Sequence, residues 1–185
     1  MAHEAIRRSS FRRDNTDGAM KIRTLEPHEI TLHRDLRLRA LQDSADSFGE
    51  TAAEAEARPL SYWEDLTRSV TEPNRHVMFL ACEGDTVCGS AYGLRDREDS
   101  GAGRVGGTWV APSHRRQGVG RALLQALFSW ARERGFKRLR LWVPSENAAA
   151  LALYRHAGFK DTGRRRPLPT NTNLQIVELE CERTQ

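Results

Sequence analysis

The sequence predicts one α/β domain built on a mixed, mostly antiparallel sheet of about six to seven strands flanked by helices. Three observations lead to this class. The 185 residues, of which 38% are hydrophobic and 29% charged, suffice for one domain with a single core. Strands alternate with amphipathic helices in the second half, which places neighbouring strands parallel. In the first half, Gly84-Asp85 separates two extended apolar segments and predicts an antiparallel hairpin.

Proline positions and apolar spacing define the elements expected in the first half of the chain. Apolar residues recur with helical spacing after Pro27 and again after Pro59, and proline is favoured where a helix begins. The expected elements are, in order, a strand over residues 21–25, a helix over 27–42, a helix over 59–70, strands over 76–82 and 86–94, and a mobile charged turn over 95–103.

The second half follows a regular alternation of strands and helices. Pro112 stops one strand, and Gly135 and Gly158 provide the left-handed conformation that commonly ends a helix. The expected elements are a strand over residues 104–110, a helix over 118–134, a strand over 138–143, a helix over 147–157, a loop carrying Arg164, Arg165 and Arg166 after a return to strand at Phe159, and a closing strand over 174–181.

The charge balance is mildly basic, with a formal net charge of +4. Residues 1–20 are rich in arginine and poor in apolar groups, so we expect a flexible basic tail before a domain spanning residues 21–183. A basic balance favours anionic partners, but the sequence has no helix-turn-helix, zinc or RNA-binding signature, and we do not expect a nucleic-acid partner. The base composition of the genome would explain the arginine content equally well.

Cysteine and histidine usage argues against disulfides and metal. The hairpin turn would place Cys82 opposite Val87 and Cys88 opposite Ala81, so the two thiols would lie on opposite sheet faces. No metal-ligand spacing occurs among the cysteines and histidines, and we expect no metal site. No apolar run approaches the ~20 residues that a membrane helix needs, and no signal-peptide core precedes the domain. We therefore expect a cytoplasmic protein without a membrane partner.

The first motif that carries chemistry is Arg115-Arg116-Gln117-Gly118-Val119-Gly120, at the junction of a strand and a helix. Its glycines let the backbone approach a ligand closely, and the helix that begins there adds its positive dipole end. It fits neither the Walker pattern nor the dinucleotide GxGxxG pattern. We interpret it as a phosphate-binding turn of another kind, with a simple tight turn as the alternative.

The second motif runs from Asn147 to Phe159 and reads NxxAxxLYxxxGF. Ala150, Leu153 and Tyr154 share one helical face, which by itself is compatible with a plain core face. With the first motif, read as VxPxxRxxGxG from Val110, it resembles the GNAT acetyltransferase superfamily. The resemblance spans residues 21–181, including the first-helix region around residues 37–49.

This resemblance implies two central parallel strands that splay apart to hold acetyl-CoA as cosubstrate. Trp109, Val110 and Asn147 would contact the pantetheine arm, and the Val110 N–H would polarise the thioester carbonyl. Tyr154 would protonate the leaving thiolate, since a phenol keeps its proton at neutral pH. The pyrophosphate would be held by the turn that begins the helix, namely Arg115, Arg116, Gln117, Gly118, Val119, Gly120 and Arg121.

The general base and the acceptor are left open by the sequence. Many similar proteins carry a glutamate in the strand before the motif, whereas this chain reads Arg104-Val105-Gly106-Gly107-Thr108-Trp109. Glu83, Glu146 or a chain of water molecules would then take the proton. The acceptor would be a small-molecule or peptide amine. Two charged segments are relevant to the identity of the acceptor. The acidic segment would suit a cationic amine, or it is simply a solvated helix face. The run Arg164, Arg165 and Arg166 would meet an anionic acceptor. The acidic residues are Glu50, Glu54, Glu56, Glu64 and Asp65.

The expected function is therefore an acetyl-CoA-dependent N-acetyltransferase that acts by direct attack of a primary amine. The alternative is a non-catalytic acyl-CoA-binding sensor of the same fold. The resemblance is compatible with a homodimer, although no residue pattern requires one.

Overall fold

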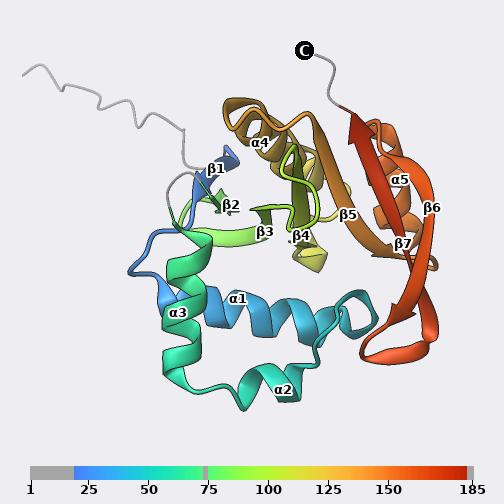
Figure 1. The fold of residues 1–185 in the computed structure, drawn as a ribbon. Helices are drawn as coiled ribbons and strands as arrows, with labels where there is room; N and C mark the ends of the chain where they lie inside the picture. The colour runs from blue at the N-terminus through green and yellow to red at the C-terminus, as the bar shows by residue number, and fades with distance from the viewer. Residues whose placement is uncertain (1–18, 73–74, 183–185) are drawn as a thin grey trace, which may run out of the picture.

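The structure is a computed structural model that describes residues 19–72 and 75–182 (Figure 1). The expected basic tail lies outside the described residues except for residues 19 and 20. Within these residues, seven strands form one sheet in the order β1-β2-β3-β4-β5-β7-β6, and all neighbours are antiparallel except β4 and β5. The mixed, mostly antiparallel sheet is thus confirmed. The strands are β1 (Lys21–Thr24), β2 (Val77–Glu83), β3 (Thr86–Arg95), β4 (Ala102–Val110), β5 (Arg138–Pro144), β6 (Lys160–Leu168) and β7 (Asn171–Glu182).

Helices cover both faces of this sheet. On one face lie α1 (Ile30–Asp43), α2 (Ala52–Glu56) and α3 (Leu60–Val70), which are grouped together in Figure 1. On the other face lie α4 (Val119–Glu133) and α5 (Ala148–His156). Two short 3-10 helices, η1 (Ala45–Ser47) and η2 (Pro112–His114), follow α1 and β4.

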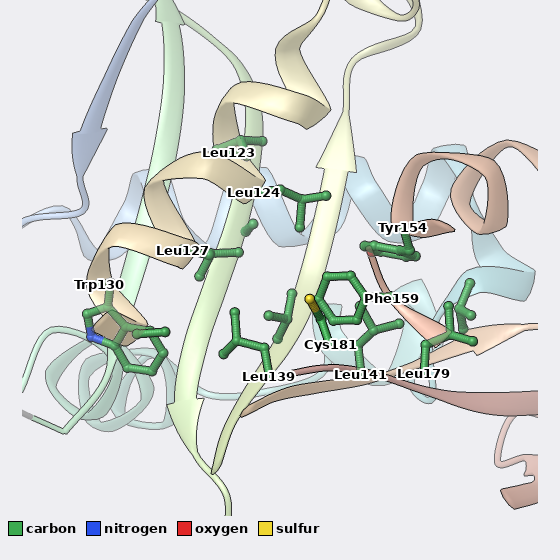
Figure 2. Close-up of a cluster of buried hydrophobic side chains, with 14 of the residues drawn as sticks. Leu123, Leu124, Leu127, Trp130, Leu139, Leu141, Tyr154, Phe159, Leu179 and Cys181 are labelled. Atoms are coloured by element: carbon green, nitrogen blue, oxygen red, sulfur yellow. The ribbon is translucent and has the colours of Figure 1, made fainter. Parts of the chain in front are cut away.

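The main core fills the space between the sheet and the helices α4 and α5. Leucines of α4 pack against Leu139 and Leu141 of β5, and Trp130 closes one end of the cluster (Figure 2). At the other end, Tyr154 of α5 lies beside Phe159. Helix α4 therefore buries one apolar face, as expected for the amphipathic helices of the second half, and this packing fixes α4 across the sheet.

Three short segments differ from the sequence-based expectations. The first helix begins at Ile30, because the Glu29 side chain accepts the Glu26 N–H at 2.8 Å and holds the preceding residues in a turn. Helix α2 was not expected, although Thr51 and Glu54 form the reciprocal capping box that its sequence encodes. The charged turn after β3 is shorter than expected, because β4 already begins at Ala102, and within the turn Asp96 accepts the N–H groups of Glu98 and Asp99.

The arginine run is the clearest correction. Arg164, Arg165 and Arg166 lie inside β6 and not in a loop, with Arg165 and Arg166 paired to Val177 and Ile176 of β7. β6 is an edge strand, and charged side chains are typical of edges because they discourage pairing with another chain. Alternation places Arg164 and Arg166 on the same face, where both guanidinium groups lie over the Trp142 ring.

The hairpin was predicted correctly in its turn but not in its full register. Cys82 pairs with Val87 as expected, whereas a bulge pairs Ala81 with Gly89 and leaves Cys88 without the expected partner. Cys82 and Cys88 nevertheless belong to core clusters on opposite sheet faces, and both thiols are free.

Candidate active site

The two parallel strands at the centre of the sheet separate along their length. β4 pairs with β5 only from Ala102 to Arg104, opposite Arg138 to Arg140. Beyond these residues both strands continue without pairing to each other, which confirms the expected separation of the central strands. The stretch of β4 that is not paired with β5 ends at Val110, next to the glycine motif.

A bulge in β4 accompanies this separation. Ser90 pairs with Trp109, but Tyr92 pairs with Gly106, so β4 carries one extra residue between these pairs. Gly107 has a φ of 57°, a left-handed conformation that glycine adopts without steric cost. A bulge bends its strand and increases the local twist. We therefore attribute the divergence of β4 from β5 to this extra residue.

The same two glycines accommodate an aromatic ring. A Cβ atom on Gly106 or Gly107 would collide with the ring of Tyr92, which lies flat against the bulge. Sequence reasoning did not single out Tyr92, and the Gly106-Gly107 pair was the signal that could have indicated a close approach at this point.

Val110 directs its peptide groups toward the gap. The neighbouring Ala111 N–H donates to Cys88 of β3 at 2.8 Å, and alternate residues of a strand bond in opposite directions. The Val110 N–H therefore points to the β5 side. Its carbonyl accepts the Arg115 Nε–H at 3.0 Å, which ties the strand end to the loop that follows.

Asp43, at the last residue of α1, joins this loop to the other face of the sheet. Its Oδ2 accepts the Trp109 indole N–H at 2.9 Å and a hydrogen bond from Arg115. Burial acts to raise the pKa of Asp43, but the bonds from Trp109 and Ser44 and the charge of Arg115 hold it below its usual value. Asp43 is therefore an anion at neutral pH, and Arg115 is engaged with the protein itself.

The glycine motif presents free N–H groups at the start of α4. Arg116 has a φ of 63° and Gly118 a φ of 84°, and no side chain caps the helix. No acceptor within the described residues takes the N–H groups from Arg116 to Arg121, since the first bond of the helix is Ala122 N–H to Gly118 O. The Gln117 side chain turns back to Ser113 O, at 2.8 Å. Free N–H groups at a helix start form an anion site.

Tyr154 and Asn147 approach the gap from α5. Tyr154 is 7% exposed, and burial raises the pKa of its phenol. The nearby side chain of Thr108 in β4 acts to lower this pKa. The buried Oγ1 of Thr108 nevertheless forms no hydrogen bond with any described residue. Asn147 caps α5 by accepting the Ala150 N–H at 3.0 Å, and its Nδ2 donates to Ser47 Oγ at 3.3 Å.

Two adjoining cavities open on the face that carries α1 and α3. The larger, of about 880 Å³, extends between these helices and the turn after β3, and the smaller, of about 250 Å³, extends toward Trp142 and the β6–β7 turn. Tyr92 and Gly107 line both. The bulge of β4 therefore stands between these cavities and the side on which α5 and Tyr154 lie.

Of the described acidic residues considered from the sequence, only Glu50 lines either of these two cavities. Glu83 pairs with His114 at 3.0 Å on the surface, and Glu146 lies in the exposed turn before α5. Neither contributes to the cavity walls. Asp65 is largely exposed and pairs with Arg68, and Glu54 serves the α2 cap, so both belong to the solvated helix faces.

Within the described residues, no group of three or more His, Cys, Asp or Glu side chains could hold a metal ion. In the same part of the chain, the helices are all too short or too polar to cross a bilayer. The site thus consists of backbone N–H groups, a buried phenol and two cavities.

The sequence pattern of the Acetyltransferase (GNAT) family matches residues 38–159, which span both motifs and the strand gap. The chain belongs to this family. An aminoglycoside N(6')-acetyltransferase type 1 from Stenotrophomonas maltophilia is 33% identical over 154 residues, covering 80% of this chain and 90% of that protein. The match extends over nearly the whole described domain.

Solved GNAT structures share the fold at lower identity. A GNAT-family acetyltransferase from Streptococcus pneumoniae superposes with a TM-score of 0.77 at 18% identity, covering 90% of this chain and 100% of that one. The yncA protein from Salmonella typhimurium, solved with its cofactor acetyl-CoA, gives a TM-score of 0.70 at 21% identity, covering 90% and 95% of the two chains. The separated parallel strands and flanking helices described above are therefore those of the GNAT fold.

Proposed function

We propose that this GNAT protein is an acetyl-CoA-dependent enzyme that transfers the acetyl group to a primary amine by direct attack, with Tyr154 as the general acid. The observation that carries the proposal is the series of free N–H groups from Arg116 to Arg121 beside the gap between β4 and β5. An anionic group and an extended arm would both be accommodated there.

The residues present fit acetyl-CoA. The N–H groups from Arg116 to Arg121 would hold its pyrophosphate, and space beyond Gly118 is open, since a Cβ there would meet no atom within 4 Å. Trp109, Val110 and Asn147 would hold the pantetheine arm in the gap. When bound, acetyl-CoA supplies an activated thioester, and the Val110 N–H is available to polarise its carbonyl.

Tyr154 would hold a proton for the leaving thiolate. Its raised pKa keeps the phenol protonated across the neutral range, as a general acid requires. Among the described carboxylates, Glu50 is the one near Tyr92 in the cavity wall, and we propose that it or water on it accepts the proton of the amine. The amine class is also supported by the relative named for aminoglycoside acetylation.

The test combines binding and turnover. Thermal unfolding is measured with acetyl-CoA, ATP or NADH in excess. Acetyl-CoA at 100 times its Kd should add about 2.7 kcal/mol and raise the Tm by roughly 5–10 °C, whereas ATP and NADH should not. Thiol release is then followed with a panel of amines. Acetyl-CoA binding without turnover, with binding unaffected by Tyr154→Phe, would support the sensor alternative. Absence of acetyl-CoA binding would exclude both the enzyme and the sensor.

A further inference from the structure

The walls of the two cavities carry more positive than negative charge. Among the described residues, four arginines and three carboxylates line the larger cavity, and three arginines and no carboxylate line the smaller. The arginines of the larger cavity are Arg37, Arg75, Arg95 and Arg97, and the carboxylates are Glu50, Glu72 and Asp96. His33 adds no charge at neutral pH, because burial and the charge of Arg37 lower its pKa to about 4.

Each of the three carboxylates is already paired with an arginine. Glu50 lies 3.1 Å from the Arg37 guanidinium, and Arg58 approaches its other oxygen at 3.8 Å. Asp96, fully buried at its side chain, pairs with Arg104 at 2.7 Å. Glu72 pairs with Arg75 at 3.5 Å. An entering cation would therefore find no uncompensated carboxylate in this cavity.

Arg97 and Arg75 are both exposed residues of the larger cavity wall and mark its outer end, and Arg97 has no carboxylate partner among the described residues. Arg97 lies close to His76. Burial is the main cause that lowers the pKa of His76, and the charges of Arg75 and Arg97 act in the same direction. The buried Nδ1 of His76 has no hydrogen-bond partner in the described part of the chain. Two guanidinium groups, of which that of Arg75 is shared with Glu72, and a ring nitrogen without a hydrogen-bond partner thus gather at this end.

The smaller cavity does not offer a second way in for a long chain. The Thr170 hydroxyl in the β6–β7 turn donates to Phe48 O at 2.9 Å, and a Cβ on Gly49 would lie 3.3 Å from Pro169. The two segments that border this cavity are therefore in contact. An extended peptide passing between them would have to break that contact, which favours a small acceptor entering from the larger cavity.

We propose that the acceptor is a small amine that also carries an anionic group, a carboxylate or a phosphate, bound by Arg97 and Arg75 at the outer end of the larger cavity. This inference rests on the proposed function and names its substrate class. Guanidinium groups bind carboxylates and phosphates alike through paired N–H donors, so these two arginines suit either anion. Polycationic amines are disfavoured, because the walls repel them and provide no free carboxylate.

The test uses the full chain and matched acceptors that differ only in the anion. Phenylalanine is compared with 2-phenylethylamine, arginine with agmatine, and O-phosphoethanolamine with ethanolamine, and kanamycin and spermidine serve as polycations. We expect kcat/KM to be at least tenfold higher for the anionic member of at least one pair. The amino acids and the phosphorylated amine distinguish carboxylate from phosphate as the anion recognised.

Variants then connect this preference to the named residues. Arg97→Gln and Arg75→Gln should each raise KM for the preferred anionic acceptor about tenfold, with a much smaller change in KM for the parent amine that lacks the anion. Arg68→Gln, an exposed arginine of α3 that lines neither cavity, should change none of these values. A merely structural role of Arg97 would alter both members of a pair alike.

Preference for kanamycin or spermidine, or an equal loss with both members of a pair in Arg97→Gln, would overturn this inference and leave the proposed function intact. Absence of turnover with every acceptor would also overturn it. Acetyl-CoA binding measured by calorimetry on the same protein then shows whether the proposed function fails as well.

Discussion

The Asp43 carboxylate and the Trp109 indole, 66 residues apart in the chain, meet through a hydrogen bond of 2.9 Å. This contact joins the end of α1, beside the cavities, to the end of β4, beside the glycine motif. Because Arg115 donates to the same carboxylate and to Val110 O, one anion positions the strand end, the loop and the helix together. The proposed acceptor side and the proposed cofactor side therefore share a single anchoring group.

Removing this anchor should cost both stability and cofactor affinity. In Asp43→Ala, Trp109 and Arg115 lose their acceptor, so we expect the free energy of unfolding to fall by about 1–3 kcal/mol. We also expect acetyl-CoA to bind several-fold more weakly, because the loop after Val110 loses its support. Denaturant unfolding and calorimetry measure the two effects. Asp65→Ala removes an exposed ion pair with Arg68 and serves as the control; a loss of equal size there would argue against a special role of Asp43.

The two ends of α4 offer a matched pair of glycines. Gly118 and Gly135 have φ values of 84° and 70°, and a Cβ on either would meet no atom within 4 Å. Valine at either position should cost a similar amount of stability, on the order of 1–2 kcal/mol, from left-handed strain. Only Gly118→Val should weaken acetyl-CoA binding, by tenfold or more, since it obstructs the free N–H groups. Equal affinity of the two variants in a calorimetric titration would show that the motif does not bind the cofactor.

Tyr154 should be separable as a chemical rather than a binding group. The Phe side chain in Tyr154→Phe keeps the edge-to-face contact with Phe159 but has no proton to donate. We expect kcat to fall about a hundredfold or more, with the acetyl-CoA Kd changed less than about twofold. Steady-state kinetics and calorimetry provide the two numbers. A parallel loss of turnover, affinity and Tm would instead indicate a structural tyrosine.

Buried His33 should make the protein less stable in mild acid. Its imidazole has a pKa of about 4 in the folded protein, and its Nδ1 lies 2.9 Å from Thr67 Oγ1. Between pH 4 and about 6.5 the unfolded chain binds more protons at this residue, so stability falls as the pH is lowered through that range. Going from pH 7 to pH 5 should cost about 2 kcal/mol from this group.

His33→Asn tests this expectation, because an amide can bond to Thr67 without titrating. Chemical denaturation at pH 7 and pH 5 should show a smaller difference in the variant than in the original protein. The same difference in both proteins would assign the acid sensitivity to other groups.

The strand and helix order was predictable because its signals are local. Apolar spacing, the prolines before the first and third helices and the glycines that end α4 and α5 act within a few residues of themselves. The arginine run in β6 was misassigned for the opposite reason, since Arg166 is held by Trp142 of another strand. A charged tripeptide carries no local sign of the ring on which it stacks.

By itself the sequence determined the α/β order, the glycine motif and the Asn147–Phe159 motif. Periodicity, backbone freedom and family resemblance all depend on residues that are near one another in the chain. Only the tertiary structure decided the bulge at Gly107 under Tyr92, the joining of Asp43 to Trp109, and the charge balance of the cavity walls. The physical reason is distance in the chain. These features depend on which side chains packing brings together from remote segments, and on which carboxylates their arginines have already neutralised.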